Sequence, residues 1–391
     1  MTLQEIVKTG YEKLRAIRPL PKTICIAAEK ILVCRTAVLG GHVWECPEGH
    51  FDRIVYNSCK HRSCPQCAYL ARERWLDRQK ARMLACEHYH VIFTLPWELH
   101  DLWRANVGSM TDLLFQAVRE TLFELLRDAK YLGADPGLII ARHTWSQTLL
   151  LHPHLHCLVT GGGVSAEGQW KPVKNGYLLP AKVVRVVFRG KLLAFIRTAL
   201  ERGELVVPAG QRLQQQLNLL NKLGRRKWNV WIPERYPHGT GVLTYLARDL
   251  RGAPMSARRI VEADEQEVTF RCRDSRKSKE TGKLEAGTMR LPIEQFVGRL
   301  LQHVPLPGQR LVRAYGVYAG GRLADLDRCR AQLGQPAFED PPVRSWQDCV
   351  APLGDDHPER CPICGARLVK RGALPAAPKD GPRKLPLRAA A

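Results

Sequence analysis

The stretch LLLHPHLHCLVTGGG, from Leu149 to Gly163, decides the fold that this sequence predicts. Three histidines recur in it at every second residue, so on a β-strand they share one face while Leu155 and Cys157 face a core. They are His152, His154 and His156. Two imidazoles at positions i and i+2 can converge on one cation, and the glycines end the strand. The pattern predicts a metal or catalytic site; the alternative is a half-exposed strand with polar residues outward.

The segments before this stretch predict the rest of the same unit. A strand over 88–95 alternates histidines with apolar residues, a long helix follows over 102–130, and a strand over 138–149 leads into the histidine strand. This order predicts an α+β fold with an antiparallel sheet covered by helices on one face. We expect the histidines to lie on the uncovered face.

A helix predicted over 240–250 is the second stretch of interest. Its apolar residues account for a core side, so Tyr245 in the middle of the helix is expected to face elsewhere. Arginines that can hold a phosphate lie close to it in sequence, and they are Arg248, Arg251, Arg258 and Arg259.

The composition points to nucleic acid as the partner. The chain has 391 residues, enough for two or three domains, and its 60 Lys and Arg against 38 Asp and Glu give a net charge of +22. Such an excess is expected of a protein that neutralises phosphates. A basic membrane-surface protein is the alternative, but no predicted helix pairs a Lys/Arg face with a Trp/Leu face, and no apolar run reaches transmembrane length. We therefore expect no membrane partner.

The 13 cysteines point to metal binding. Residues 1–18 predict an amphipathic helix rather than a signal peptide, so we expect a cytoplasmic protein. In a reducing compartment, clustered cysteines bind metal rather than form disulfides.

The densest cysteine region predicts one structural zinc site. Its candidate ligands are Cys46, His50, Cys59, Cys64 and Cys67. The Cys-x-x-Cys of SCPQC is a turn that wraps sulfurs around zinc, and four ligands close a tetrahedral site. We favour Cys46, His50, Cys64 and Cys67, with Cys59 as the substitute for His50. Buried or redox cysteines are the alternative.

Basic residues also lie inside this cysteine region. Lys60 and Arg62 are placed there to touch a DNA backbone. A solvated charged turn is the alternative interpretation of the same residues.

The C-terminal part of the chain contains a partial zinc motif. His357, Cys361 and Cys364 form half of a site that Cys329 or Cys349 would complete. The closing segment PAAPKDGPRKLPLRAAA lacks apolar periodicity, and we expect a disordered basic tail there.

Several motifs in a fixed order resemble a known family. They are CRTAVLGGH, NSCKHRSCPQC, HVIFTLPWELH, HPHLHCLVTGGG, TYLARDL and RAYGVYA, spread over about residues 20–320. The series resembles the rolling-circle transposases of bacterial insertion sequences of the insertion-sequence-ninety-one type, which belong to the HUH endonucleases, named for His-hydrophobic-His. The ordered series is far more specific than any single motif.

The resemblance implies a ferredoxin-like or RRM-like HUH sheet behind an N-terminal zinc-binding domain, with His154 and His156 as the HUH pair. It implies Mg²⁺ or Mn²⁺ at that pair, Zn²⁺ in the N-terminal domain, and single-stranded DNA at insertion-sequence ends as the substrate. Tyr245 would attack a phosphodiester in line, which leaves a 5′-phosphotyrosine and a free 3′-hydroxyl. The third metal ligand stays open, and the candidates are His152, which is nearest, and then Gln147, His88 and His90.

Two positions depart from the family's pattern. The family usually carries two tyrosines four residues apart, whereas this chain has Tyr245 and then Asp249. This argues against a two-tyrosine strand alternation and is compatible with the one-tyrosine relatives. Cys46-Pro-Glu-Gly-His50 stands where the family tends to have Cys-x-x-Cys, so the identity of one zinc ligand stays open.

These features divide the chain into an N-terminal helix and zinc-binding domain over 1–85, an HUH endonuclease domain over 86–320, and a C-terminal segment over 321–391. We predict a metal-dependent transposase that nicks and rejoins single-stranded DNA in rolling-circle transposition. The main alternative is a non-catalytic zinc-dependent DNA-binding protein, which would bind without nicking. The second alternative is a metallohydrolase that acts on a small substrate, but this function would not explain the net charge of +22 or the separate cysteine region.

Overall fold

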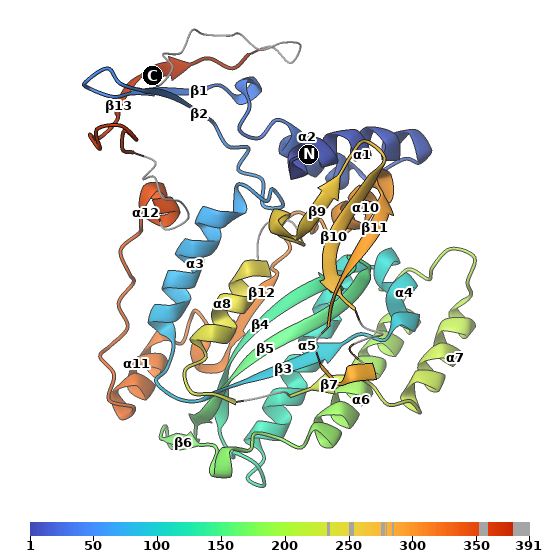
Figure 1. Cartoon of the computed structure of the whole chain (residues 1–391). Helices are drawn as coiled ribbons and strands as arrows, with labels where there is room; N and C mark the ends of the chain where they lie inside the picture. The colour runs from blue at the N-terminus through green and yellow to red at the C-terminus, as the bar shows by residue number, and fades with distance from the viewer. Residues whose placement is uncertain are drawn as a thin grey trace.

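The computed structural model describes residues 1–232, 235–249, 254–274, 278, 280–283, 285–351 and 359–377. The side chains of Tyr245, Arg248 and Asp249 lie outside the described part, as do Arg251 and His357 entirely. Within the described residues the chain is a mixed α+β structure with antiparallel sheets, as the sequence predicts (Figure 1).

The largest sheet contains the histidine strand. Its strands follow the order β12-β4-β5-β3-β7, with β6 beside β5 and β8 beside β3, and the neighbours are antiparallel. Their bounds are β3 His88–Thr94, β4 Asp135–Trp145, β5 Leu151–Val164, β6 Trp170–Pro172, β7 Val230–Trp231, β8 Arg235–Tyr236 and β12 Val312–Tyr315. The histidine strand β5 therefore has a neighbouring strand on each side.

Helices cover one face of this sheet and form the main core with it. They are α4 His100–Ala105, α5 Val107–Arg127, α6 Ala181–Glu201 and α7 Leu213–Gly224. The alternating residues Val91, Phe93, Leu155 and Cys157 belong to this core and are fully buried. Full burial of one large apolar side chain contributes roughly 1.5–3 kcal/mol, so the alternation determines which face of β3 and β5 is left for the histidines.

The histidine face of the sheet is covered in part, contrary to the prediction. The covering elements are α3 Ala68–Arg82, α8 Thr240–Asp249 and the short helix η5 Gly316–Tyr318. Ile139, Ala141 and Leu158 lie on this face and share a buried cluster with Val242 and Leu243 of α8. Because β4 and β5 carry apolar residues on both faces, both faces need cover from water, and α8 supplies it on this side.

A second core joins the start of the chain to a later part. Its elements are α1 Leu3–Ile17, α2 Lys22–Leu32, β9 Ile260–Ala263, β10 Glu267–Arg273, β11 Ala286–Pro292 and α10 Ile293–Leu301. The predicted first helix is α1, and a capping box of Thr2 and Glu5 begins it. Gly10 of α1 lies against Val297 of α10, where a Cβ would meet the valine side chain at 2.5 Å. The first helix is therefore packed on residues far later in the sequence.

A third sheet brings the two ends of the described chain together. β1 Gly41–Glu45 pairs on one side with β2 Asp52–Tyr56 and on the other with β13 Val369–Leu374. In Figure 1 the red strand β13 lies beside the blue β1–β2 hairpin. The Ala377 amide also donates to the Ala37 carbonyl at 2.9 Å. Part of the segment predicted as a disordered tail is therefore ordered, and 378–391 lie outside the described residues.

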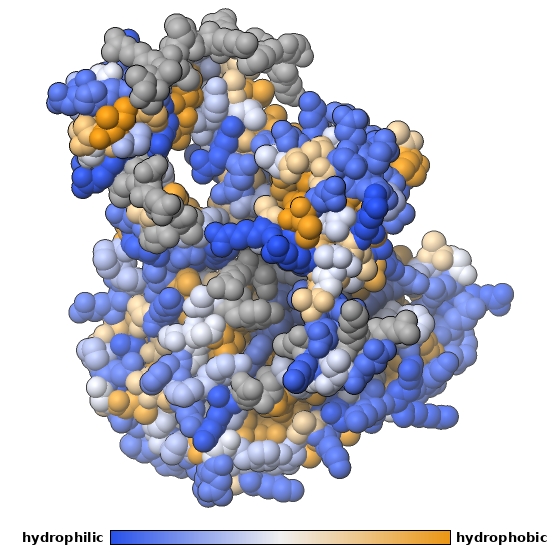
Figure 2. Space-filling model, in the orientation of Figure 1, coloured by the Kyte–Doolittle hydropathy of each residue, from blue (hydrophilic) through white to orange (hydrophobic). Residues whose placement is uncertain are grey.

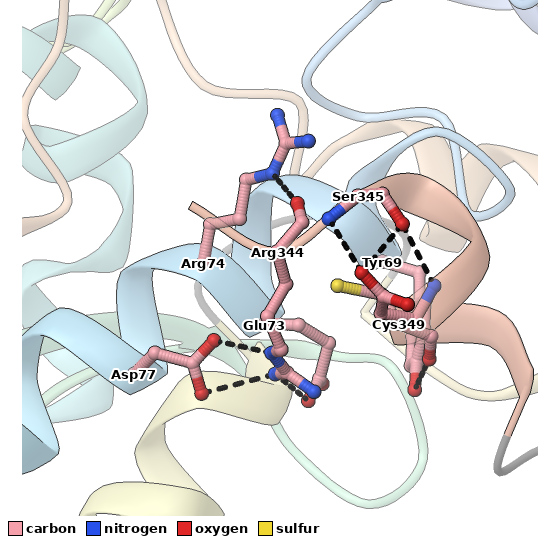
Figure 3. Close-up of polar contacts among 8 residues, drawn as sticks. Tyr69, Glu73, Arg74, Asp77, Arg344, Ser345 and Cys349 are labelled. Carbon is pink, nitrogen blue, oxygen red and sulfur yellow. Dashed lines mark hydrogen bonds and ion pairs between the residues drawn. The ribbon is translucent and has the colours of Figure 1, made fainter. Parts of the chain in front are cut away.

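The chain reaches β13 through a C-terminal arm, residues 323–350, that runs beside α3. The arm contains α11 Leu323–Gln332 and α12 Trp346–Val350. Figure 3 shows that the Arg344 guanidinium donates to both carboxylate oxygens of Asp77, at 2.7 and 3.0 Å. In the same view Arg74 donates to the Arg344 carbonyl, and the Tyr69 hydroxyl donates to the Cys349 carbonyl. Polar contacts therefore hold this part of the arm to α3.

Besides η5, short helices connect the longer elements of the described chain. The short helices are η1 Ala37–Leu39, η2 Trp97–Leu99, η3 Lys174–Gly176 and η4 Ala257–Arg259. No helix among the described residues is long and apolar enough to cross a membrane. Hydrophilic residues predominate on the face shown in Figure 2, and hydrophobic residues gather there in small groups, in keeping with the net charge of +22.

We predict that Gly316→Ala destabilises the protein. Gly316 has a φ of +61°, and a Cβ there would lie 1.8 Å from the Pro136 carbonyl oxygen. A left-handed backbone costs an L-residue roughly 1–2 kcal/mol, and overpacking adds roughly 1–3 kcal/mol. Chemical denaturation should therefore show an unfolding free energy lower by about 2 kcal/mol or more. Gly321→Ala is the matched control, because nothing lies within 4 Å of its Cβ position; equal losses in the two variants would contradict the prediction.

Candidate metal centre

A hairpin of β4 and β5 brings histidines from two strands together. The Ser146 amide closes its turn by donating to the Leu150 carbonyl at 3.0 Å. Leu149 takes a left-handed φ of +61° in this turn, and its side chain is fully buried in the second core, which offsets the strain. His303 donates from Nε2 to the Leu149 carbonyl at 3.0 Å. Contacts from outside the sheet therefore fix the turn and, with it, the register of the two strands.

That register pairs His143 of β4 with His154 of β5. Directly opposite side chains share a face, with Cβ atoms about 5 Å apart. The ligand nitrogens of His143, His154 and His156 lie within 4.8 Å of one another, and the ring centroids of His143 and His156 are 4.4 Å apart. This three-imidazole group can share one cation.

His152 lies on the same strand but is not part of the three-imidazole group. Residues i and i+4 of a strand are about 13 Å apart, so His152 and His156 cannot reach one ion, whereas a neighbouring strand is only about 4.8 Å away. The third imidazole therefore comes from β4. The sequence analysis missed His143, although a tight turn near Leu149 would have paired it with His154.

Two of the other candidate ligands have partners of their own. His88 donates from Nδ1 to the Cys86 carbonyl at 2.9 Å and accepts at Nε2 from the Tyr318 hydroxyl at 2.8 Å. Gln147 lies in the hairpin turn, where its backbone carbonyl accepts from Arg259. His88 is not a member of the three-imidazole group.

Hydrogen bonds orient the rings of His154 and His156. The Nδ1 of His154 donates to the His152 carbonyl at 2.7 Å, so in the neutral ring Nε2 carries the lone pair. The Nδ1 of His156 lies 2.8 Å from Nε2 of His90, and the two rings stack with centroids 5.1 Å apart. With Nε2 of His156 on a cation, its Nδ1 would hold the proton and donate to His90. His90 itself is not a member of the three-imidazole group.

Burial keeps these imidazoles neutral. Removal from water lowers the pKa of His154 and of His90 to about 4. The same cause holds the pKa of His143 and of His156 well below the usual range of histidine. Because the neutral imidazole is the form that binds metal, protons do not compete for the lone pairs at neutral pH.

Helix α8, which carries Tyr245, lies over the same face of the sheet. Its residue Leu246 is fully buried in a cluster that includes Ala141, and Ala141 is the strand partner of His156. The side chain of Tyr245 lies outside the described part. The backbone of α8 nevertheless places position 245 on an element that covers the histidine face.

Among the described residues the cysteines fall into two groups that could each hold a metal ion, and the four ligands favoured from sequence are divided between the two groups. The first cysteine group is Cys34, Cys59, Cys64 and Cys67, and the second is Cys46, His50, Cys361 and Cys364. Cys46 and His50 lie at the tip of the β1–β2 hairpin, whereas Cys59 follows its base. Each strand has five residues and spans about 15 Å, so tip and base cannot share one ion.

The first cysteine group has the spacing of a four-sulfur zinc site. The Cys67 sulfur lies 3.3 Å from that of Cys34 and 3.6 Å from that of Cys59. With Zn–S bonds of about 2.3 Å, two sulfurs on tetrahedral zinc lie about 3.8 Å apart. A hydrogen bond from the Cys64 thiol lowers the pKa of Cys67 to about 4, toward the thiolate that binds zinc. Cys34, which the sequence analysis missed, belongs to the motif CRTAVLGGH.

The basic residues expected at DNA have different surroundings. Lys60 and Arg258 are exposed. Arg62 donates to one backbone carbonyl and Arg259 to two, so these two side chains also hold the fold together. The remaining candidates are Arg248, whose side chain lies outside the described part, and Arg251, which lies outside it entirely.

Comparison with protein families gives two matches. Residues 137–325 match the family model described as "Putative transposase", and residues 6–95 match the one described as "Transposase zinc-binding domain". The first range contains the three-imidazole group and α8. The second contains all of the first cysteine group but only Cys46 and His50 of the second.

Curated relatives agree with these matches. "Putative transposase y4qJ" of Sinorhizobium fredii is 35% identical over 344 residues, which cover 85% of this chain and 85% of the relative. "Transposase for insertion sequence element IS801" of Pseudomonas savastanoi pv. phaseolicola is 26% identical over 353 residues, which cover 88% of this chain and 82% of the relative. No solved structure shows a significant match.

We predict that Cys64→Ser combined with Cys67→Ser removes one zinc ion per chain, because a site with half of its ligands does not hold the metal. Elemental analysis of the purified protein measures the loss, and thermal unfolding should occur at a lower temperature. Unchanged zinc content and folding would show that this cysteine group is not a zinc site.

We predict that His143→Ala weakens Mn²⁺ binding by more than about 100-fold, because loss of an orienting partner alone costs about 10–100-fold and His143 would be a direct ligand. His90→Ala should fall in that smaller range. His152→Ala is the matched control and should bind nearly as the unaltered protein does. Titration of the zinc-loaded protein, followed by electron paramagnetic resonance, gives the affinities. Equal losses in the His143 and His152 variants would refute the grouping.

Proposed function

We propose that this chain, which belongs to the transposases of the insertion-sequence-ninety-one type, acts on single-stranded DNA by a rolling-circle mechanism. Membership of this family makes DNA its substrate, and the cleavage and transfer of DNA strands its chemistry. In this mechanism it nicks and rejoins DNA at the ends of its element through a 5′-phosphotyrosine. The observation that carries the proposal is the buried group of His143, His154 and His156 beneath the helix that carries Tyr245.

The strand order supports an HUH fold for this part of the chain. The chain runs through β3, α5, β4, β5, α6 and β7, and the strands lie in the order β4-β5-β3-β7. This is the succession of a ferredoxin-like sheet, in which two strand–helix–strand halves interlock. The His-Leu-His sequence lies on the inner strand β5, and both of its histidines face away from α5 and α6.

The donor set fits a divalent cation. His143, His154 and His156 would hold it, and His90 would fix the ring of His156. Nitrogen ligands suit Mn²⁺ better than Mg²⁺, which prefers oxygen. When bound, the cation would polarise the scissile phosphate and stabilise the negative charge that develops on it.

Tyr245 is the proposed nucleophile. Its deprotonated phenolic oxygen attacks phosphorus, so a bond from tyrosine oxygen to phosphorus forms while the bond from phosphorus to the 3′-oxygen breaks. The 3′-oxygen takes up a proton and leaves as a hydroxyl. The phosphotyrosine ester preserves the energy of the broken bond, so a 3′-hydroxyl can later attack it and release the tyrosine.

A one-tyrosine scheme follows from the sequence of α8. Asp249 stands one helical turn after Tyr245, where the family usually has a second tyrosine. A mixed anhydride on an aspartate would hydrolyse rather than store the strand end. We therefore propose that each chain holds at most one covalent DNA end at a time.

Binding to DNA is proposed to rest on charge. The chain carries a net charge of +22, and Lys60 and Arg258 are exposed cations among the described residues. Neutralised phosphates release counterions, so affinity should fall steeply as salt rises. Binding of DNA and cleavage of DNA would then depend on different residues.

We predict that His154→Ala and His156→Ala each abolish metal-dependent nicking and leave DNA affinity and its salt dependence nearly unchanged. Labelled single-stranded DNA with Mn²⁺ on a denaturing gel measures nicking, and fluorescence anisotropy at several salt concentrations measures binding. Nicking by the double variant would rule out the histidine strand as the active site. Binding without nicking by the unaltered protein would favour the zinc-dependent DNA-binding alternative.

We predict that Tyr245→Phe retains fold and DNA affinity but forms no covalent protein–DNA band, because only the phenolic oxygen is lost. Tyr236→Phe is the matched control and should still form the band. Mass spectrometry of the adduct should identify the peptide that contains Tyr245. An adduct on Tyr236, Tyr315 or Tyr318 would overturn the assignment.

A further inference from the structure

We propose that the protein binds a second structural zinc ion, shared between its N-terminal and C-terminal segments. The ligands are those of the second cysteine group, Cys46, His50, Cys361 and Cys364, whose ligand atoms lie within 4.8 Å of one another. The matched family ranges, 6–95 and 137–325, include only half of them. The site is independent of the strand transfer proposed above and of the first cysteine group, whose ligands all lie within residues 34–67.

The distances within the second group fit a single ion. The Cys46 sulfur lies 3.5 Å from the Cys364 sulfur and 3.9 Å from Nδ1 of His50. With Zn–S bonds of about 2.3 Å and Zn–N bonds of about 2.0 Å, tetrahedral zinc sets its ligands about 3.5–3.8 Å apart. Three sulfurs and one imidazole nitrogen form a complete Cys₃His site, a common composition for structural zinc.

Two matching turns present these ligands. In both turns the amide of the leading cysteine, Cys46 or Cys361, donates at 2.8 Å to the carbonyl five residues later. In both, the following glycine, Gly49 or Gly365, donates back to the cysteine carbonyl at 2.9 Å. Both glycines have a left-handed φ, +74° and +73°. The glycine follows Cys46 by three residues and Cys361 by four, so the two turns share the closing hydrogen bond and the left-handed glycine, and each turn supplies a pair of ligands.

The apolar cluster around the site is small. Its buried members are Cys46, Cys361 and Leu368, with Trp44 and Phe51 partly buried beside them. Two of the three buried residues are themselves proposed ligands. A module with so little apolar burial depends on metal to fold, which explains why ligands rather than larger apolar residues occupy its centre.

The ion also fixes the segment 359–377, which follows the C-terminal arm in the chain. The contacts of the arm with α3 in Figure 3 include the ion pair of Arg344 and Asp77, and a neighbouring pair joins Arg78 and Asp340, whose side chains are 58% and 59% exposed. The Arg78–Asp340 pair, which is this exposed to water, contributes little. β13 follows the second turn directly and pairs with β1. Zinc at this site therefore closes the chain from Cys46 to Cys361 and keeps β13 in the sheet.

Cadmium-113 NMR of the full-length protein, with its zinc exchanged for cadmium, tests the proposal. We expect one resonance in the region of four sulfur ligands and a second in the region of three sulfurs and one nitrogen. The three-imidazole group contains no sulfur, so any resonance from it lies well apart from both. A spectrum without the mixed sulfur–nitrogen resonance would overturn the proposal.

The substitution His50→Cys replaces the nitrogen ligand of the second cysteine group by a sulfur ligand and keeps four ligands at the site. It should move the mixed resonance into the four-sulfur region and leave the resonance of the first cysteine group where it is. A mixed resonance that stays in place would show that His50 is not a ligand and would overturn the proposal.

Removal of two ligands provides a second test. Cys361→Ser combined with Cys364→Ser should lower the zinc content by one ion per chain and speed the amide hydrogen exchange of β13. Cys25→Ser combined with Cys272→Ser is the matched control, because neither cysteine belongs to a metal-binding group, and it should keep all of its zinc. Unchanged zinc in the Cys361 and Cys364 variant would overturn the proposal. Should that variant fail to fold, the NMR result with His50→Cys decides.

Discussion

The pairing of β4 with β5 is the interaction on which the candidate metal centre depends. It sets His143 against His154, and a shift of one residue would put the buried Arg142 in that place instead. Leu149 opposes such a shift, because its side chain at the hairpin turn is buried in the second core with residues of α1 and α10. The geometry of the histidines is therefore tied to packing at the nearby hairpin turn, between segments that are distant in sequence.

Burial keeps the imidazole rings neutral, and because buried polar atoms need partners it also requires that the ring nitrogens form hydrogen bonds. An unsatisfied buried polar group costs about 1–3 kcal/mol, and the His152 carbonyl and His90 supply the bonds for His154 and His156. Apolar neighbours on β4 and β5, together with α8, exclude water and keep the rings neutral. Because Tyr245 belongs to α8, the helix that excludes water from the site also carries the proposed nucleophile in its sequence.

The two cysteine groups occupy the centres of small units around the β1–β2 hairpin, in the place where a larger domain would have an apolar core. The first cysteine group lies where the β1–β2 hairpin leads into α3, and the second lies at the tip of that hairpin. A two-stranded hairpin is marginally stable alone in water, so the third strand β13 supports it, and the proposed zinc ions would add to that support. This arrangement also explains why the sequence holds so many cysteines without a disulfide framework.

The sequence by itself determined the properties that depend on near neighbours. Alternation placed His154 and His156 on one face of a strand, helical periodicity marked the helices, and close cysteine spacing marked zinc ligands, while the ordered motifs identified the family. Only the tertiary structure decided that His143 completes the three-imidazole group, that Cys361 and Cys364 join the second cysteine group, and that α8 covers the histidine face. Each of these depends on strand register or on contacts between distant segments, about which the periodicity within one segment carries no information.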